Sequence, residues 1–285
     1  MVKLLKLNQR GYPSSLSKIE KPPDPLYCLG DPDFKIFNHC LAVVGSRKMS
    51  DYGRQAIEKL LPEVVEAGVT IVSGFMHGID ETAHRVCLES KGRTIAVLGC
   101  GIDLVRPTVL KDLHEKILAG GGLIVSELEG EHPPFRWTFV RRNRIISGLS
   151  QATLVVEAGE ESGSLITAQF AKKQKRKVLA VPGPIGASGS RGTAKLIRQG
   201  ATLISTAWEI LQALGIKADD RKKRVLTGLS QEEKKILDFI GEGDLSADEI
   251  SRGLKVPSAQ LGSLLSILLV KGRLKQNSRS CYYLP

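Results

Sequence analysis

Leu41-Ala42-Val43-Val44 is a run of four apolar residues, and Gly45-Ser46-Arg47 follows it directly. A strand with one face in water alternates apolar and polar residues, whereas this run does not alternate. The run therefore predicts a strand that is covered on both faces. The glycine that follows predicts a tight loop at the end of this strand.

The same unit of apolar run, Gly/Ser-rich break and helical segment repeats as far as Leu214. The other six runs are Val69–Val72, Thr94–Leu98, Leu123–Val125, Thr153–Val156, Val178–Val181 and Thr202–Ile204. Strands that alternate with helices favour a mostly parallel sheet with helices on both faces. We therefore predict an α/β fold, a Rossmann-like doubly wound sheet over residues 38–215.

The rest of the chain predicts three further segments. Residues 1–37 are Pro-rich in part and are expected to form an N-terminal extension that packs on the sheet as an extended arm. Residues 216–228 contain a charged run without apolar residues and are expected to be a linker. Two capping boxes, Ser230 with Glu233 and Ser246 with Glu249, open short helices, and a third helix and a hairpin follow. This pattern predicts a small C-terminal winged-helix domain over residues 229–285.

Composition restricts the class of protein. The 41 Lys and Arg residues exceed the 30 Asp and Glu residues, which gives a net charge of +11 and favours a polyanionic partner. The five cysteines are scattered and form no C-x-x-C pair, so neither a disulfide framework nor a zinc site is indicated. No signal peptide or membrane span is expected, and we predict a cytoplasmic protein.

Ligands of doubly wound sheets bind beyond the carboxyl ends of the strands, so the breaks after the strands are the candidate sites. Gly45, Ser46 and Arg47 could converge on one phosphate through backbone N–H groups, a hydroxyl and a guanidinium. A tight turn with a surface arginine is the alternative. The loop is not G-x-G-x-x-G, so no dinucleotide cofactor is expected.

Two other breaks belong to the same predicted site. Ser162, Gly163 and Ser164 precede a helix and could form a second phosphate cradle, although simple N-capping is compatible with this sequence. Ser73 and Gly74 follow the second apolar run and are also included as candidate contacts.

The segment 136–144 reads RWTFVRRNR and interleaves four arginines with two aromatic rings. Arginine binds phosphates and a ring offers a stacking face for a base, a combination that suits single strands. We single out Arg136 and Phe139, followed by Arg142, Asn143 and Arg144. The alternative is that Trp137 and Phe139 are core residues and that the arginines are solvated.

No catalytic residue and no metal site is predicted. His77, Asp80, Glu81 and His84 match no metal-binding motif, and we interpret them as structural. In the winged helix, the segment 258–270 has no charged residue, although readers of the major groove normally present Arg, Lys, Asn or Gln. A role as a duplex-binding regulator is the alternative that this domain leaves open.

Several of these stretches together resemble the DNA-processing protein A family, called DprA or Smf. The matching stretches are 43–47, 52–53, 73–74, 78–80, 83–84, 94–99, 126–127, 142–146, 162–168 and 182–183. The resemblance implies a non-enzymatic protein that binds single-stranded DNA, forms a homodimer and helps to load the RecA recombinase in natural transformation. It also implies that Arg47 meets a phosphate and that Arg136 and Phe139 help to hold a nucleotide.

An enzymatic alternative is a nucleotide phosphoribohydrolase of the lysine-decarboxylase-like family, which shares a Rossmann-like fold. Those enzymes carry a P-G-G-x-G-T-x-x-E signature. The corresponding loop here, residues 159–167, reads GEESGSLIT and lacks that signature. The prediction is therefore a single-stranded DNA binder without a cofactor.

Overall fold

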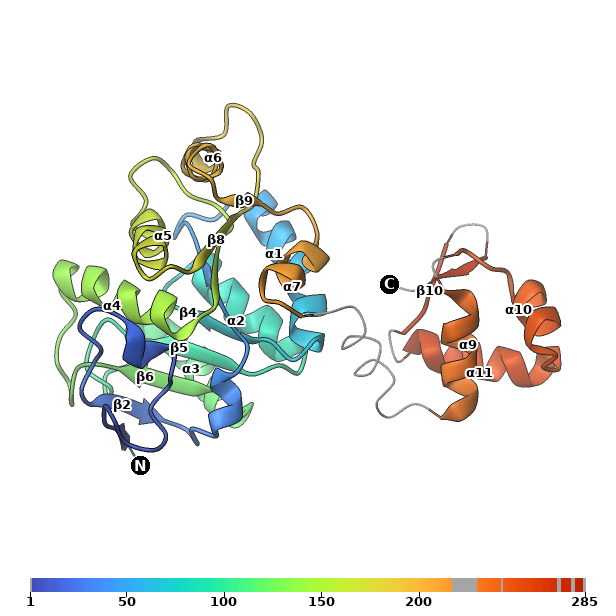
Figure 1. Cartoon of the computed structure of the whole chain (residues 1–285), viewed down its shortest axis with the longest axis horizontal. Coiled ribbons are helices and arrows are strands. Elements are labelled where there is room, and N and C mark those ends of the chain that lie inside the picture. Colours follow the sequence, from blue (N-terminus) through green and yellow to red (C-terminus); the bar gives the residue numbers. More distant parts are fainter. Residues whose placement is uncertain (1, 217–229, 242, 271–272, 278–279, 284–285) are drawn as a thin grey trace. The chain divides into compact units, whose positions relative to one another are not determined.

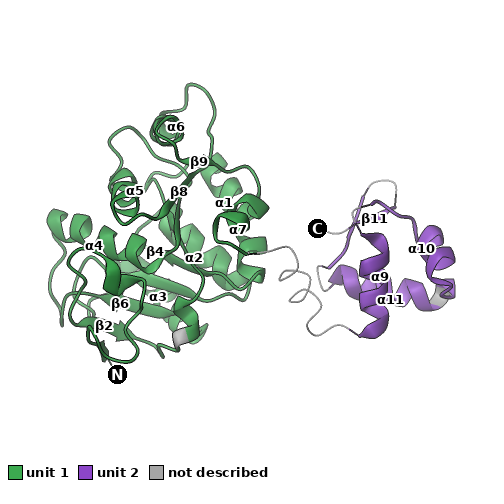
Figure 2. Cartoon of the chain, in the orientation of Figure 1, with its two compact units in different colours: residues 1–217 green, residues 218–285 purple. Residues whose placement is uncertain are grey.

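The computed structural model describes residues 2–216, 230–241, 243–270, 273–277 and 280–283. They form two compact units, residues 1–217 and residues 218–285 (Figure 2). Residues 217–228, which make up most of the predicted linker (residues 216–228), lie outside the described residues.

The described part of the first unit is built on a nine-stranded sheet in the order β1-β2-β6-β5-β4-β3-β7-β8-β9 (Figure 1). All seven strands predicted from the apolar runs are present, and neighbours among them pair in parallel. Their bounds are β3 (Cys40–Val44), β4 (Thr70–Ser73), β5 (Thr94–Val97), β6 (Leu123–Ser126), β7 (Ala152–Val155), β8 (Lys177–Ala180) and β9 (Thr202–Leu203).

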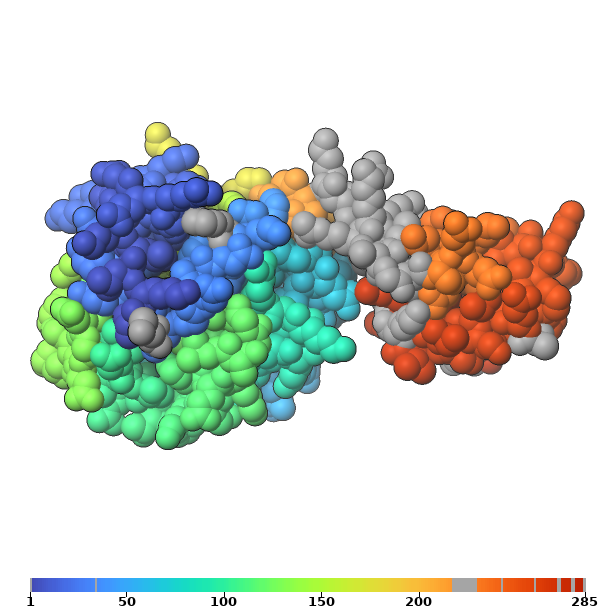
Figure 3. Space-filling view, turned by 90° about the horizontal axis from the view of Figure 1, so that it is seen from below, coloured from blue at the N-terminus to red at the C-terminus, as the bar shows by residue number. Residues whose placement is uncertain are grey.

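The N-terminal segment extends the sheet rather than packing on it as an arm. β2 (Leu26–Leu29) pairs antiparallel with β6, and β1 (Lys3–Leu5) pairs antiparallel with β2. Figure 3 shows these first residues, in blue, beside the green part of the chain that contains β6. The hydrogen bonds of an edge strand can be completed by any extended segment, and sequence periodicity in three or four residues does not reveal such pairing.

Helices cover both faces of the sheet. Leu41 and Val43 of β3 point into a core with α1, α2 and α7, while Ala42 and Val44 point into a second core with α4 and α5. Burial of both sets of side chains explains why β3 has no polar alternation. The helices of this unit are α1 (Asp51–Glu66), α2 (Ile79–Glu89), α3 (Lys111–Ala119), α4 (Arg136–Leu149), α5 (Gly163–Lys173), α6 (Arg191–Arg198) and α7 (Ala207–Ala213).

The second unit has the predicted winged-helix arrangement. Both predicted capping boxes are formed, at Ser230 with Glu233 and at Ser246 with Glu249. The helices pack on one apolar cluster, and the wing is completed by a bridge between Leu245 and Tyr282. The elements are α9 (Gln231–Ile240), α10 (Ala247–Leu254), α11 (Ser258–Val270), β10 (Lys275–Gln276) and β11 (Tyr282–Tyr283).

The strand order determines where a ligand can enter the first unit. From β3 the chain moves outward through β4, β5 and β6, then returns along α4 to β7 on the other side of β3. The loops after β3 and β7 therefore leave the sheet in opposite directions and open a crevice between them. Among the described residues, no helix is long and apolar enough to cross a membrane.

Candidate functional site

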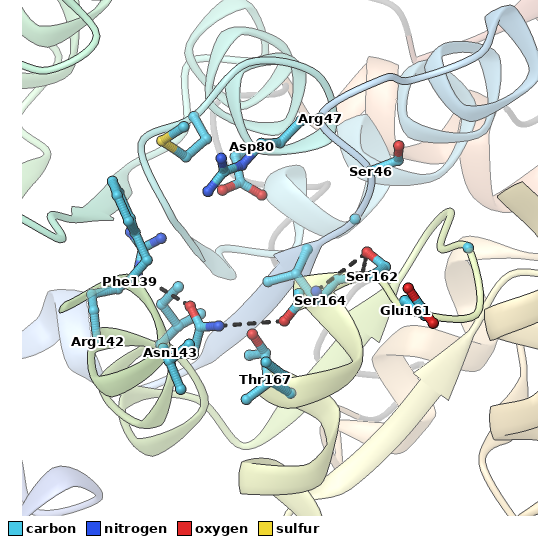
Figure 4. Close-up of a pocket in the computed structure, with 18 of the residues that line it drawn as sticks. Ser46, Arg47, Asp80, Phe139, Arg142, Asn143, Glu161, Ser162, Ser164 and Thr167 are labelled. Carbon is cyan, nitrogen blue, oxygen red and sulfur yellow. Dashed lines mark hydrogen bonds between the residues drawn. The ribbon is translucent and has the colours of Figure 1, made fainter. Parts of the chain in front are cut away.

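A pocket of about 910 Å³ opens at the crevice between the ends of β3 and β7 (Figure 4). It brings together the two predicted phosphate cradles and the arginine-rich helix α4. The predicted residues that line it are Gly45, Ser46, Arg47, Arg136, Phe139, Arg142, Asn143, Ser162, Gly163 and Ser164.

The loop after β3 is held by its own hydrogen bonds. The Ser46 backbone N–H donates to the Glu157 carbonyl over 2.8 Å, and the Ser46 hydroxyl accepts from the Lys48 N–H over 3.0 Å. A Cβ at Gly45 would lie 2.5 Å from the Ile79 side chain, so only glycine fits there. Arg47 and Lys48 are exposed and line the pocket.

The second cradle is the start of α5. Ser162 is its N-cap, and its hydroxyl lies 2.8 Å from that of Ser164 (Figure 4). The predicted N-capping is confirmed, and it leaves Gly163 exposed at the pocket wall. A helix N-terminus combines unpaired N–H groups with a positive dipole end, so this wall favours an anion.

One face of α4 forms the opposite wall. Arg136, Phe139 and Asn143 recur at helical spacing and all line the pocket. The Phe139 ring is half-buried, and the Cζ atoms of Arg47 and Arg142 lie 5.3 Å and 5.9 Å from its centroid. A ring near two guanidinium groups in an open pocket suits both a base and its phosphate. The alternative that Phe139 is a core residue is not supported by this geometry.

Arg142 lies deeper than the other cations. It is only 4% exposed, and it donates hydrogen bonds to the Val97 carbonyl and, from Nε over 3.3 Å, to Asn143 Oδ1. Burial lowers the pKa of Arg142 to about 10, and Asp80 opposes this shift. Burial also raises the pKa of Asp80 to about 6, and Arg142 opposes that shift. Both groups are therefore charged at neutral pH.

Three predicted residues lie outside the pocket and have structural contacts. The Ser73 hydroxyl donates to the Val43 carbonyl over 2.6 Å, and both residues are buried. A Cβ at Gly74 would collide with Asp80 and Arg142, so Gly74 makes room for that pair. Arg144 does not line the pocket and forms an ion pair with Glu127.

Ten other residues that line the pocket were not predicted as contacts, and Lys48, Met76, Asp80 and Thr167 are among them. Lys48 directly follows Arg47, so its positive charge could have identified it from the sequence as a further phosphate contact. Asp80 was interpreted as structural, and as the second residue of α2 it faces the pocket. Its role depends on Arg142, which is 62 positions away in the sequence, and no local pattern reveals that contact.

The histidines near Asp80 have structural partners. His84 is fully buried, and its ring nitrogens lie 2.7 Å from the Thr94 hydroxyl and from the Gly74 carbonyl oxygen. His77 lies 3.3 Å from Glu81 on the surface of α2. Within the described ranges, no three His, Cys, Asp or Glu side chains cluster as metal ligands would.

The pocket lining carries more positive than negative charge. Its basic residues are Arg47, Lys48, Arg136 and Arg142, and its acidic residues are Asp80 and Glu161. Two anion-binding loops and an accessible ring within one basic pocket are the elements that a nucleic-acid strand requires.

The sequence match to known families agrees with this geometry. Residues 3–215 match the family model described as DNA recombination-mediator protein A. The chain belongs to this family. Residues 220–278 match a second model, the DprA winged helix domain.

Individual members of the DprA family are similar to this chain at about 40% identity. Protein Smf of Escherichia coli (strain K12) is 43% identical over 211 residues, which are 74% of this chain and 56% of that protein. DNA processing protein DprA of Bacillus subtilis (strain 168) is 38% identical over 213 residues, which are 75% of this chain and 71% of that protein. The match thus spans little more than half of the Escherichia coli relative.

Solved DprA structures share the fold. The X-ray structure of DprA from Streptococcus pneumoniae superposes with a TM-score of 0.69 at 37% identity, covering 74% of this chain and 73% of that one. The structure of DprA from Helicobacter pylori concerns a unique single-stranded DNA binding mode of that protein. It gives a TM-score of 0.66 at 29% identity, and the match covers 75% of this chain and 95% of that one.

Proposed function

We propose that this chain binds single-stranded DNA in the pocket between β3 and β7 and acts as a recombination mediator. The observation that carries the proposal is the arrangement of Arg47, Phe139 and the Ser162–Ser164 cradle around one cavity. Arg47 supplies a phosphate contact, Phe139 a stacking face and the cradle a second phosphate site. The Helicobacter pylori relative, described as binding single-stranded DNA, supports the same ligand class.

The pocket favours an unpaired strand over a duplex. The Phe139 ring can stack only on a base that has left its partner, because bases inside a duplex are already stacked on each other. The two guanidinium groups near the ring also keep the phosphate of the same nucleotide within the basic part of the pocket.

The test is binding of a labelled oligo(dT) over a series of salt concentrations, with a duplex of equal length beside it. We expect Arg47→Ala to weaken binding of the single strand about tenfold and to reduce the log–log salt slope by about 0.7, the loss of one phosphate contact. Lys59→Ala, which removes an exposed lysine of α1 outside the pocket, is the matched control. An unchanged affinity and slope for Arg47→Ala would contradict the proposal.

We further propose that the chain acts as a homodimer and delivers the strand to a RecA-type recombinase, because this is the role that membership of the recombination-mediator family supports. Sedimentation velocity tests the dimer. Assembly of RecA filaments on single-stranded DNA, with wild type and Arg47→Ala compared, tests delivery. A monomer at all concentrations would contradict the dimer. Equal stimulation of RecA filament assembly by wild type and Arg47→Ala would contradict delivery from the pocket.

We also propose that the pocket performs no covalent chemistry. Its two acidic residues are Asp80, which is packed against Arg142, and Glu161, which is exposed beside the α5 cradle. Neither has the paired arrangement that glycosidic bond cleavage by two carboxylates uses. Release of free base from nucleoside monophosphates, abolished by Glu161→Gln, would instead support a phosphoribohydrolase.

A further inference from the structure

An exposed aromatic cluster lies at the start of α4, beside the pocket. Phe135 is 48% exposed and Trp137 is 51% exposed. Their rings are parallel within 6°, with centroids 6.3 Å apart. The His132 ring meets both edge-on, at centroid distances of 6.0 Å and 6.2 Å.

The fold does not require apolar side chains at positions 135 and 137. Phe135 and Trp137 belong to none of the three core clusters of this unit, and half of each side chain faces solvent. Exposed aromatic residues that gather on a surface mark interaction sites more often than isolated ones do. The alternative that Trp137 is a core residue is therefore wrong.

The cluster is held in place by the backbone around it. The Phe135 N–H donates to the Thr138 hydroxyl over 3.0 Å, and that hydroxyl also donates to the Gly99 carbonyl at the end of β5. The His132 carbonyl accepts from the Gly101 N–H over 2.8 Å. Rings on such an anchored turn are preorganised, so little conformational entropy is lost when a ligand stacks on them.

Arg136 connects the cluster to the pocket. It stands between Phe135 and Trp137 in the sequence and lines the pocket, whereas neither ring does. One turn further along α4, Phe139 is the stacking ring of the pocket itself. A strand that leaves the pocket past Arg136 therefore meets Phe135 and Trp137 next.

We propose that Phe135 and Trp137 form a second stacking platform, which holds bases of single-stranded DNA outside the pocket. This proposal rests on the proposed binding of a strand in the pocket. Aromatic stacking accepts any base, which suits a protein that binds strands without regard to sequence. Of the three acidic residues in the preceding loop, Glu127 is paired with Arg141 and Arg144, Glu129 interacts with Tyr27, and Glu131 is exposed.

Tryptophan fluorescence provides a direct test. The chain has two tryptophans, Trp137 and Trp208, so Trp208→Phe leaves Trp137 as the only indole. Titration with oligo(dT) of about 4 to about 16 nucleotides, the range of known site sizes, should quench Trp137 only above the length that fills the pocket. An oligonucleotide of the longer size with abasic residues outside the pocket segment should not quench it, and neither strand should quench Trp208 in the Trp137→Phe protein.

Two double variants separate stacking from general apolar contact. Phe135→Leu with Trp137→Leu keeps apolar side chains but removes both rings, and we expect about tenfold weaker binding of the longer oligonucleotide with the short one unaffected. Phe135→Tyr with Trp137→Tyr keeps the rings and should retain the affinity of the wild type.

The outcomes distinguish this proposal from the proposed function. If Arg47→Ala weakens binding but Trp137 is not quenched and the leucine variant binds normally, the platform is wrong and the pocket stands. The platform is also wrong if the leucine variant alters sedimentation but not DNA affinity, because the cluster is then a protein contact. If wild type binds no single-stranded DNA, the proposed function itself fails.

Discussion

The backbone amide of Ser46 donates a hydrogen bond of 2.8 Å to the carbonyl oxygen of Glu157. This bond joins the loop after β3 to the loop after β7, the two sides of the crevice. The Glu157 carboxylate strengthens the same connection, because its Oε2 accepts from the Ser50 N–H over 2.9 Å at the start of α1. Glu157 therefore fixes the width of the pocket without lining it.

We predict that Glu157→Ala destabilises the first unit by about 1–3 kcal/mol, the usual cost of removing the charged partner of a buried hydrogen bond. It should also weaken binding of single-stranded DNA, because the segment after Arg47 loses the carboxylate that accepts from the Ser50 N–H, although the backbone bond between Ser46 and residue 157 remains. Urea unfolding followed by tryptophan fluorescence reports on this unit, since both tryptophans lie in it. Glu160→Ala, at an exposed neighbouring position, should change neither property.

Arg142 and Arg47 should respond differently to truncation, although both contact Phe139. Arg142→Ala leaves Asp80 partly buried without its nearby cation and removes the hydrogen bond to the Val97 carbonyl, so we expect a loss of about 3–5 kcal/mol in the free energy of unfolding. Arg47 is exposed, so Arg47→Ala should change stability by less than about 0.5 kcal/mol. Equal stabilities of the two variants would show that Arg142 has no structural role.

The affinity for single-stranded DNA should rise as pH falls from about 7.5 to about 5.5. The pKa of Asp80 is raised to about 6, chiefly by burial, so its carboxylate becomes neutral within this window. Loss of that negative charge favours a phosphate in the pocket by roughly three- to tenfold. Asp80→Asn should bind more tightly at pH 7.5 and show a flatter pH dependence, and the same slope in both proteins would assign the effect to another group.

The contribution of His84 to the stability of the first unit should fall between about pH 6.5 and about pH 4, whereas protonation of Asp80, whose pKa is raised to about 6, acts in the opposite direction there. Burial lowers the pKa of His84 to about 4, so the unfolded chain binds a proton in this window that the folded chain does not. The neutral His84 ring contributes fully to the free energy of unfolding above the pKa that this residue has in the unfolded chain. On acidification this contribution is lost at up to about 1.4 kcal/mol per pH unit. Urea unfolding at pH 7 and at pH 5 should show that His84→Gln loses less stability on acidification than wild type does.

The sequence by itself determined the strands and the loops that carry the chemistry. β3, β4 and β7 were predictable because a strand buried on both faces is mostly apolar without polar alternation, a local requirement that composition records. The loops at Gly45–Arg47 and Ser162–Ser164 were predictable for a similar reason, since glycine and N-capping serine reflect backbone needs within a few residues.

The tertiary structure decided which of the loops predicted to form one site share a cavity: Gly45–Arg47 and Ser162–Ser164 line it, whereas Ser73 and Gly74 do not. The order that places β7 beside β3 arises from the packing of α4 and α5 against the sheet, and no residue in either strand encodes it alone. Arg144, predicted as a contact, is paired with Glu127 and does not line the pocket, while Asp80, interpreted as structural, also lines it. Burial and charge pairing depend on groups brought together from distant parts of the chain, and for that reason local residue patterns do not predict them.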